Sequence, residues 1–360
     1  MPNATKKALR VRKSTPAPAQ PPASPEDLWN DSIRDVVVRK AGALAQQCHI
    51  TNGSSFRLKG HDPSNTMGFA SEGHPVAREA RESGLQAVSE LQDMLYAVNK
   101  WAVLLIFQGM DASGEDGAIK HVMSGVNPEG CQVYSFKEPS SEDLDHDYLW
   151  RCVKCLPNRG EIGIFNRSYY EEILVVRVHP DLLAKEKIPP SLKTENIWKD
   201  RFEEIRSFER YLRRNGIVTA KFFLNLSKEE QKQRFLERID NPKKNWKFRA
   251  ADIAERDYWD DYQKAFEDMI RNTSTAENPW YVIPADNKWF ARILVAAAVI
   301  HTLGHLKLSY PKIGDAKLAE IRKARRMLLD SAPRTGFKGI KRPGHLGSAA
   351  RKGAAAFKSE

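Results

Sequence analysis

One stretch of the sequence constrains the fold more than any other: an apolar run that leads into a glycine-rich loop. Residues 103–107 are all apolar, and GMDASGEDG follows at 109–117. A helical pattern then continues from about Gly117 to Gly125. An apolar run of this length is typical of a strand buried on both faces of a parallel sheet. A strand, a glycine-rich loop and a helix in this order are the context in which a loop binds phosphate.

The loop has the spacing of a phosphate-binding loop but not its usual charge. Four residues separate Gly109 from Gly114: Met110, Asp111, Ala112 and Ser113. The backbone N–H groups of such a loop converge on phosphate oxygens, and the helix N-terminus adds roughly half a positive charge. The common pattern continues with Lys and then Ser or Thr, whereas Glu115 and Asp116 stand here. From the spacing alone, a chance glycine-rich turn remains an alternative.

Further apolar runs predict more strands of the same sheet. They lie at 131–136, 161–165, 221–226 and 280–283, with helical patterns between them. Strands that alternate with helices favour a parallel sheet covered by helices on both faces, so we predict a three-layer α/β/α fold. Residues 181–215 interrupt the alternation with two adjacent prolines and a charged helical stretch. This interruption predicts an inserted helical lid.

The net charge of +11 belongs to the two ends of the chain rather than to its body. Residues 1–24 hold five basic and no acidic side chains, and residues 331–360 hold seven basic and one acidic. The 306 residues between them hold 45 of each sign. We expect disordered basic tails at 1–26 and 331–360, which could contact polyanions nonspecifically. The folded domain is predicted at 27–305 and a helical extension at 306–330.

No segment of the sequence predicts insertion into a membrane. The apolar runs 293–300 and 101–107 fall short of the ~18 residues that cross a bilayer. The basic N-terminus lacks the apolar core of a secretory signal, although its lack of acids leaves an organellar transit peptide as an alternative. Four cysteines are too few for a disulfide framework, and the pair Cys152 and Cys155 lacks a second pair of zinc ligands. We predict two partly buried thiols and a cytoplasmic protein.

A second motif, EIGIFNRSYYEE at 161–172, ends another predicted strand in polar residues. The carboxyl ends of parallel strands meet at one edge of the sheet, so Arg167 should lie beside the glycine-rich loop. There its planar donors could brace a phosphate. Lys137 follows the preceding strand, near the same edge. The alternative for Arg167 is a surface arginine in a polar turn.

The charged stretch within 181–215 carries several arginines. Arg201 comes first, and four more share one helix face through spacings of three and four: Arg206, Arg210, Arg213 and Arg214. Such a face could bind a polyanion. Glutamates lie between the arginines, so a solvated helix face is the alternative.

Six stretches resemble, in the same order, the polyphosphate kinase 2 family. The resemblance covers about residues 50–305, and the stretches that carry it read GMDASGEDG, SGVNPEGCQVYSFKEPS, LDHDYLWR, GIFNRSYYEEILVVRVHP, KFFLNLSKEEQKQRFLERIDNPKKNWKF and STAENPWYVIPADNKWFAR. The resemblance implies a P-loop kinase fold similar to that of thymidylate kinase. It implies reversible phosphoryl transfer between inorganic polyphosphate and nucleotides with Mg²⁺, and Mn²⁺ is a further candidate metal. It also suggests a homo-oligomer.

The resemblance assigns roles to residues of the two motifs. Asp111 matches the family's Walker A aspartate, which lies close to the metal and the transferred phosphate. Asn166 and Arg167 match the Walker B region, where many members have Asp-Arg. The loop that wraps the phosphates matches the residues around Asp111: Gly109, Met110, Ala112, Ser113, Gly114, Glu115, Asp116 and Gly117.

Further residues match the parts of the family that bind nucleotide and polyphosphate. Glu171 stands where members that accept nucleoside monophosphates have Glu and some that use diphosphates have Asn. Tyr170 and Lys137 are grouped with it as nucleotide contacts. The lid and channel that grip the polyanion are matched to basic residues: Lys120, Arg177, Arg201 and Arg206. The resemblance is closest to the subclass that converts AMP to ADP, and ADP and GDP are further candidate acceptors.

Glu115 departs from the family pattern, because the family has the Walker A lysine at this position. Loss of a charge-assisted contact to phosphate typically costs about 1.5–3 kcal/mol, before any repulsion is added. Three interpretations are open. Another cation (Lys120, Lys137 or a lid arginine) replaces the lysine, Glu115 holds Mg²⁺ directly or through water, or the protein is a weakened or inactive relative. We favour a working enzyme because the other phosphate-binding elements are retained.

Two functions from other classes are also compatible with the sequence. One is a non-catalytic protein that binds polyphosphate or nucleic acid, which the missing lysine and the basic tails favour. The other is a nucleotide kinase that takes its phosphate from ATP.

Overall fold

The structure is a computed structural model that describes residues 31–330. The tails predicted at 1–26 and 331–360 lie outside the described residues. The described chain divides after Tyr310 into two units. The first contains the sheet and its covering helices, and the second contains the helix α12 (Asp315–Asp330).

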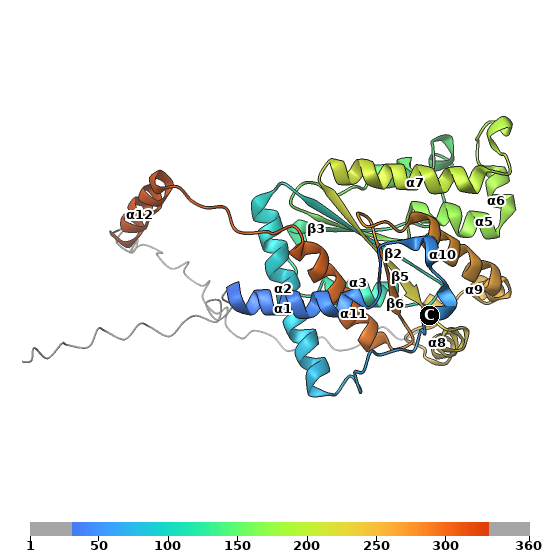
Figure 1. Ribbon diagram of the computed structural model, residues 1–360, viewed down its shortest axis with the longest axis horizontal. Helices are drawn as coiled ribbons and strands as arrows, with labels where there is room; N and C mark the ends of the chain where they lie inside the picture. Colours follow the sequence, from blue (N-terminus) through green and yellow to red (C-terminus); the bar gives the residue numbers. More distant parts are fainter. Residues whose placement is uncertain (1–30, 331–360) are drawn as a thin grey trace, which may run out of the picture. The chain divides into compact units, whose positions relative to one another are not determined.

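Six strands of the first unit form one sheet, and helices cover both of its faces (Figure 1). The strands are β1 (His49–Ile50), β2 (Ala102–Gly109), β3 (Cys131–Ser135), β4 (Ile162–Asn166), β5 (Ile217–Asn225) and β6 (Trp280–Pro284). The longer helices are α1 (Asp31–Gln46), α2 (Pro75–Val98), α3 (Glu115–Val122), α7 (Ile197–Arg214), α8 (Lys228–Asp240), α10 (Trp259–Thr273) and α11 (Lys288–Gly304). The short helices are α4 (Trp150–Val153), α5 (Val175–Val178), α6 (Pro180–Lys185) and α9 (Ala250–Ala254).

The strand order of the sheet is β1-β6-β5-β2-β4-β3. The edge strand β1 runs antiparallel to β6, and all the other neighbouring strands are parallel. The central strand β2 lies between β5 and β4, where Phe107 is paired with Asn166. The backbone N–H of Arg167 then donates to the carbonyl of Phe107 (3.0 Å). The two motifs therefore leave the sheet at the same edge.

Strand β2 is buried on both faces, which explains its unbroken apolar run. Val103, Leu105 and Phe107 belong to a core shared with α2, α3 and α11. Leu104 and Ile106 point to the opposite face, into a second core shared with α7 and α10. The three-layer α/β/α arrangement predicted from the sequence is confirmed (Figure 1).

The segment predicted as a lid, residues 181–215, contains two different parts. Its second half is the helix α7, which buries Phe202, Ile205 and Leu212 in the core against the sheet. That helix is therefore a covering layer of the fold and not a lid. Most of its charged residues occupy the outer face, although Arg201 and Glu209 are buried, and these charges concealed an ordinary amphipathic pattern. Residues 186–196, before α7, form mostly exposed turns.

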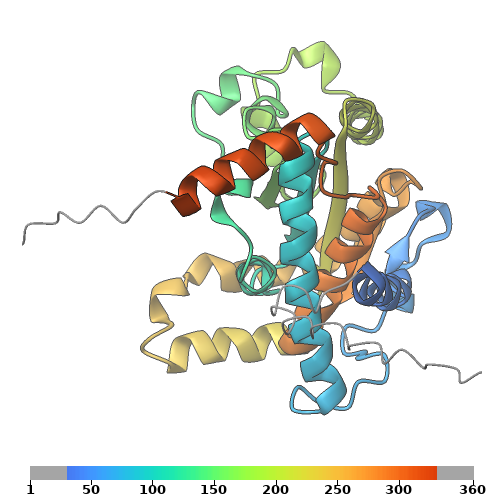
Figure 2. The same cartoon turned by 90° about the vertical axis from the view of Figure 1, so that its left-hand side faces the viewer.

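A different segment extends away from the body of the first unit. Residues 241–258 join α8 to α10 and project outward in Figure 2, in the gold part of the colour range. Most of these residues are exposed, and Trp246 retains 77% of its accessible surface. We call residues 241–258 the basic arm because several lysines and arginines lie on it: Lys243, Lys244, Lys247, Arg249 and Arg256.

Two further features concern the expectations about membranes and cysteines. Within residues 31–330, no helix has both the length and the hydrophobicity needed to cross a membrane. All four cysteines carry free thiols, and Cys48 and Cys152 are buried whereas Cys131 and Cys155 are partly buried.

Candidate active site

The glycine-rich loop joins β2 to α3 in a tightly curled conformation. Ala112 and Gly114 have left-handed backbones, with φ of 67° and 109°. The helix begins at Glu115, two residues earlier than predicted. A Cβ atom on Gly109 would lie 2.9 Å from Cβ of Ser113 and would overlap the Ser113 hydroxyl, so the loop can fold this closely only over glycine. The result is a helix N-terminus and converging backbone N–H groups at the carboxyl edge of the sheet, a typical arrangement for binding phosphate.

We expect Gly109→Ala to lower the free energy of unfolding by about 1–2 kcal/mol, because the added methyl group must displace Ser113. Urea denaturation followed by circular dichroism measures this difference. Gly60→Ala is a matched control, since a Cβ at Gly60 meets nothing within 4 Å. Equal unfolding free energies for the two variants would contradict the close packing inferred at Gly109.

A buried arginine from α8 holds the loop in place. The Arg234 side chain is 4% exposed, and its Nη1 donates to the carbonyls of Ala112 (2.9 Å) and Ser113 (2.8 Å). One turn earlier, Gln231 Nε2 donates to the carbonyl of Asp111 (2.9 Å). These contacts were not predicted from the sequence. Their only signal was a glutamine and an arginine spaced i, i+3 on the helix that follows β5.

The structure brings Asp111 and Arg167 into direct contact. Arg167 Nη2 lies 2.5 Å from Asp111 Oδ1, and Nη1 lies 3.7 Å from Glu171 Oε2. The backbone of Arg167 has φ of 62°, a strained value for a residue with a side chain. The chain therefore turns sharply at Arg167, directly after the end of β4. The carboxylate of Glu171 raises the pKa of Arg167, which stays cationic. Burial raises the pKa of Glu171, and the charge of Arg167 opposes that effect.

The side chain of Glu115 turns back over the start of its own helix. Its Oε2 accepts a hydrogen bond from the backbone N–H of Gly114 (3.0 Å). Burial raises the pKa of Glu115, whereas its own backbone N–H, the charge of Arg167 and the Ser113 hydroxyl lower it. The carboxylate therefore occupies the groups that a bound phosphate would use: a loop N–H, the helix N-terminus and a nearby arginine.

The other acidic residue of the loop, Asp116, connects two segments that are distant in sequence. Its Oδ1 accepts from Asn166 Nδ2 (3.0 Å), and its Oδ2 accepts from Lys247 Nζ (3.1 Å). Lys247 lies on the basic arm, so a cation from that arm reaches the first turn of α3. Lys247 was not predicted from the sequence, although it lies in the basic run NPKKNWKFR, because the lid was predicted at 181–215.

The Polyphosphate kinase 2 family model matches residues 75–311, a range that includes every side chain of this site. The chain belongs to the polyphosphate kinase 2 family. An ADP-polyphosphate phosphotransferase from Rhodopseudomonas palustris is 52% identical over 252 residues, which are 70% of this chain and 87% of that protein. An AMP/ADP-polyphosphate phosphotransferase from Meiothermus ruber is 45% identical over 257 residues, 71% of this chain and 92% of that protein.

A solved structure agrees with these sequence comparisons. The crystal structure of Polyphosphate Kinase 2 from Arthrobacter aurescens TC1 matches this chain with a TM-score of 0.69 and 36% identity. The match covers 77% of this chain and 96% of that one. The family resemblance and the P-loop kinase-like fold expected from the sequence are thereby confirmed.

Two residues expected at the site of this polyphosphate kinase 2 family member lie in its interior instead. Tyr170 is fully buried, and its hydroxyl donates to Glu209 Oε1 (2.7 Å) and accepts from Lys221 Nζ (3.0 Å). Arg201 is 3% exposed and pairs with two partly buried glutamates, Glu172 (2.9 Å) and Glu186 (2.6 Å). Both side chains are therefore engaged by partners within the protein. Tyr170 instead holds the segment after Arg167 against the core.

The remaining predicted cations do not join the cluster around Asp111. Lys120 and Lys137 are exposed. Arg206 donates to the carbonyl of Asn272 (2.6 Å). Arg177 pairs with Asp268 (2.8 Å) and lines a separate cavity of about 670 Å³ whose charged residues include both signs.

A metal site of the family type fits the residues present. Among residues 31–330, no three His, Cys, Asp or Glu side chains converge to form a complete metal cage. Mg²⁺ usually takes only one or two protein carboxylates and completes its octahedron with water and substrate phosphates. Asp111, whose side chain is 27% exposed beside the loop, is suited to that role.

Proposed function

We propose that this protein catalyses reversible phosphoryl transfer between inorganic polyphosphate and nucleotides, with AMP, ADP or GDP as acceptors. The observation that carries the proposal is the contact of Asp111 with Arg167 beside a P-loop at the carboxyl edge of the sheet. The polyphosphate-dependent relatives named above support transfer from polyphosphate over the binding-only and ATP-dependent alternatives.

Phosphoryl transfer requires positioning and neutralisation of charge more than covalent chemistry. The loop N–H groups and the N-terminus of α3 would hold the phosphate that is transferred. Arg167 would bind neighbouring phosphate oxygens through its planar donors, for which its attachment to β4 provides a rigid base. Asp111 would hold Mg²⁺, which supplies charge neutralisation when bound. Asn166 orients Asp116 and thereby the first turn of the helix.

The role of the missing Walker A lysine passes, in this proposal, to Lys247 together with Arg167. Lys247 is the lysine of the basic arm whose ammonium reaches the first turn of α3, at 3.1 Å from Asp116. Its side chain is 37% exposed, and the arm around it is largely free of the core. An arm of this kind can swing toward a bound polyanion and bring a charge that the loop lacks.

We expect Lys247→Gln to lower kcat/KM for polyphosphate by about tenfold, the effect of losing one charge-assisted contact to phosphate. A coupled assay of ATP formation from polyphosphate and ADP measures the change. Lys243→Gln is a matched control, because it removes the same charge from the same arm at a more exposed position. Equal losses in both variants would show that the arm attracts polyphosphate only through its overall charge.

The proposed activity is tested by supplying purified protein with long-chain polyphosphate and Mg²⁺ or Mn²⁺, and with AMP, ADP or GDP as acceptor. ATP replaces polyphosphate in a parallel series. If none of the acceptors gains a phosphoryl group from polyphosphate, the proposal fails. A variant without residues 1–24 and 331–360 should keep both transfer and polyphosphate binding. If binding disappears with these tails, the binding-only alternative is favoured.

The proposal also includes a homo-oligomeric, cytoplasmic enzyme. Membership of the family supports this part. Light scattering coupled to gel filtration measures the mass of the particle in solution, and a monomer would contradict it.

A further inference from the structure

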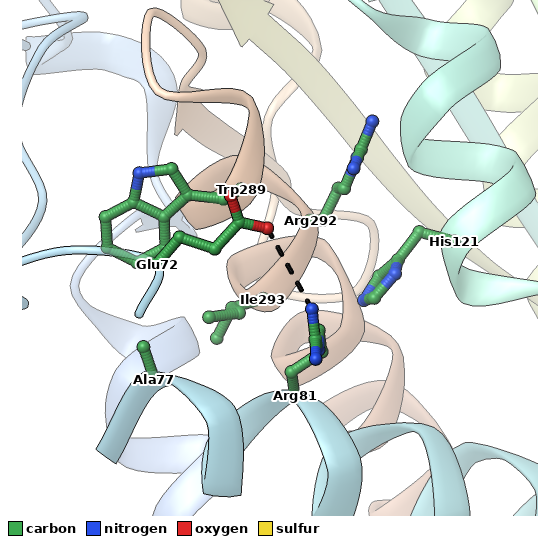
Figure 3. A pocket seen from close by; sticks show the side chains of 7 residues that line it. All are labelled: Glu72, Ala77, Arg81, His121, Trp289, Arg292 and Ile293. Atoms are coloured by element: carbon green, nitrogen blue, oxygen red, sulfur yellow. Dashed lines mark ion pairs between the residues drawn. The ribbon is translucent and has the colours of Figure 1, made fainter. Parts of the chain in front are cut away.

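A small hollow lies between α2, α3 and α11 (Figure 3). Three basic side chains from three helices surround it: Arg81 of α2, His121 of α3 and Arg292 of α11. The hollow holds about 40 Å³ of free volume. That is enough for water or for the oxygen atoms of one anion and too little for a drug-sized organic molecule.

The positive charge around the hollow is poorly compensated. Glu72 is the one acidic residue that lines it, and its carboxylate is 3.9 Å from Arg81 and 59% exposed. Within residues 31–330, Arg292 makes no hydrogen bond or ion pair. The Nε2 atom of His121 is buried and also lacks a partner. Polar groups left without partners are unfavourable, and an anion would satisfy all three side chains together.

The neighbours of His121 lead to the same conclusion. Burial lowers the pKa of this imidazole, and the charges of Arg292 and then Arg81 lower it further. The two charged groups that shift the pKa of His121 are therefore both cations. The negative charge of a bound phosphate would oppose these effects and raise the pKa of His121.

The hollow is connected to the glycine-rich loop along one face of α3. Arg292 Nη2 lies 3.3 Å from the position that a Cβ on Gly117 would occupy, so the guanidinium crosses the first turn of the helix. Gly117 and His121 are four residues apart and share a helix face. Because an α-helix rises about 1.5 Å per residue, the hollow lies roughly 9 Å along the axis from Glu115. A linear chain of phosphates whose end is held at the loop could follow this face.

We propose that Arg81, His121 and Arg292 form a second phosphate subsite, which binds polyphosphate several units away from the phosphate that is transferred. This inference rests on the proposed function and adds a determinant of donor length to it. A long donor occupies the loop and the hollow together, whereas inorganic triphosphate is too short to span both. The subsite should therefore raise the preference of the enzyme for long-chain donors.

The experiment compares kcat/KM for long-chain polyphosphate and for inorganic triphosphate, with ADP as acceptor in both cases. We expect Arg292→Gln and Arg81→Gln each to lower the long-to-short ratio by about tenfold, mainly through the KM for the long donor. Arg39→Gln is the matched control, because Arg39 is exposed on α1 and does not line the hollow. It should leave the ratio unchanged. Arg292→Lys keeps the charge and should recover part of the preference.

Two outcomes of the kinetic experiment would overturn the subsite. The first is an unchanged long-to-short ratio of kcat/KM in Arg292→Gln and Arg81→Gln. The second is an equal loss with both donors, which would mean that Arg292 supports the loop itself. Calorimetric titration with long-chain polyphosphate, in the absence of acceptor, separates this inference from the proposed function. Suppose that the wild-type protein binds long-chain polyphosphate without transferring phosphate, and that Arg292→Gln weakens that binding. In that case the transferase proposal fails and the subsite stands. If inorganic phosphate competes equally well with long and short donors, the hollow binds free phosphate rather than the chain.

Discussion

Replacing Asp111 by asparagine is expected to lower phosphoryl transfer by about a thousandfold or more while the protein stays folded. Asparagine has nearly the same shape, so the change removes a charge and little else. That charge pairs with Arg167 at 2.5 Å and belongs to the carboxylate best placed to hold Mg²⁺. Loss of one preorganised electrostatic group in an active site typically costs about 10²–10³-fold in rate, and loss of metal binding adds to this.

Initial rates of ATP formation over a range of Mg²⁺ concentrations measure the effect of Asp111→Asn. Asp181→Asn serves as the control, because Asp181 is an exposed residue of α6 that pairs with Lys185. Thermal denaturation should show that both variants fold. A rate for Asp111→Asn within tenfold of wild type would remove Asp111 from the proposed mechanism, whatever its contact with Arg167.

The architecture could be predicted because its main determinants are local in sequence. The apolar run of β2 reports burial on both faces, and the glycines after it report a loop that no larger residue could form. Because parallel strands end at a common edge, the position of Arg167 beside the loop followed from the topology alone. These inferences needed no knowledge of individual side-chain contacts.

The predicted lid included α7 because charge was taken as a sign of exposure. In α7 the arginines and glutamates surround a narrow apolar stripe that includes Phe202 and Ile205, and this stripe packs on the sheet. Arg201 even points inward, where Glu172 neutralises it. The basic arm, by contrast, was hidden within a stretch that looked like the end of one helix and the start of another. Only tertiary structure shows which charged segment leaves the core.

Tyr170 shows a similar limit at the level of one side chain. It was expected to contact the nucleotide, because it stands next to Glu171 in a motif that matches the family. Its actual partners are Glu209 and Lys221, from α7 and β5, and they form a buried charged pair at 2.7 Å. No local pattern links these three residues. The hydrogen bonds that bury the tyrosine exist only once the helix has packed on the sheet.

Replacing Glu115 by lysine is expected to lower the KM for polyphosphate by about tenfold to a hundredfold. The Glu115 carboxylate accepts the N–H of Gly114 and lies near Arg167, so it acts as an internal anion on the phosphate site. Polyphosphate must displace this carboxylate or bind beside it against repulsion. A lysine removes the competitor and adds one charge-assisted contact to phosphate, which is worth about 1.5–3 kcal/mol.

Glu115→Gln separates the two contributions, since glutamine keeps the shape and the hydrogen bond to Gly114 but removes the negative charge. We expect a KM between those of wild type and Glu115→Lys, measured with long-chain polyphosphate at fixed ionic strength. If both variants lose transfer, the carboxylate has a positive role and the most direct one is to hold Mg²⁺. If neither KM changes, Glu115 has no important role in binding the donor. If KM instead falls from wild type to Glu115→Gln and again to Glu115→Lys, the Glu115 carboxylate lowers the affinity of a working kinase for polyphosphate.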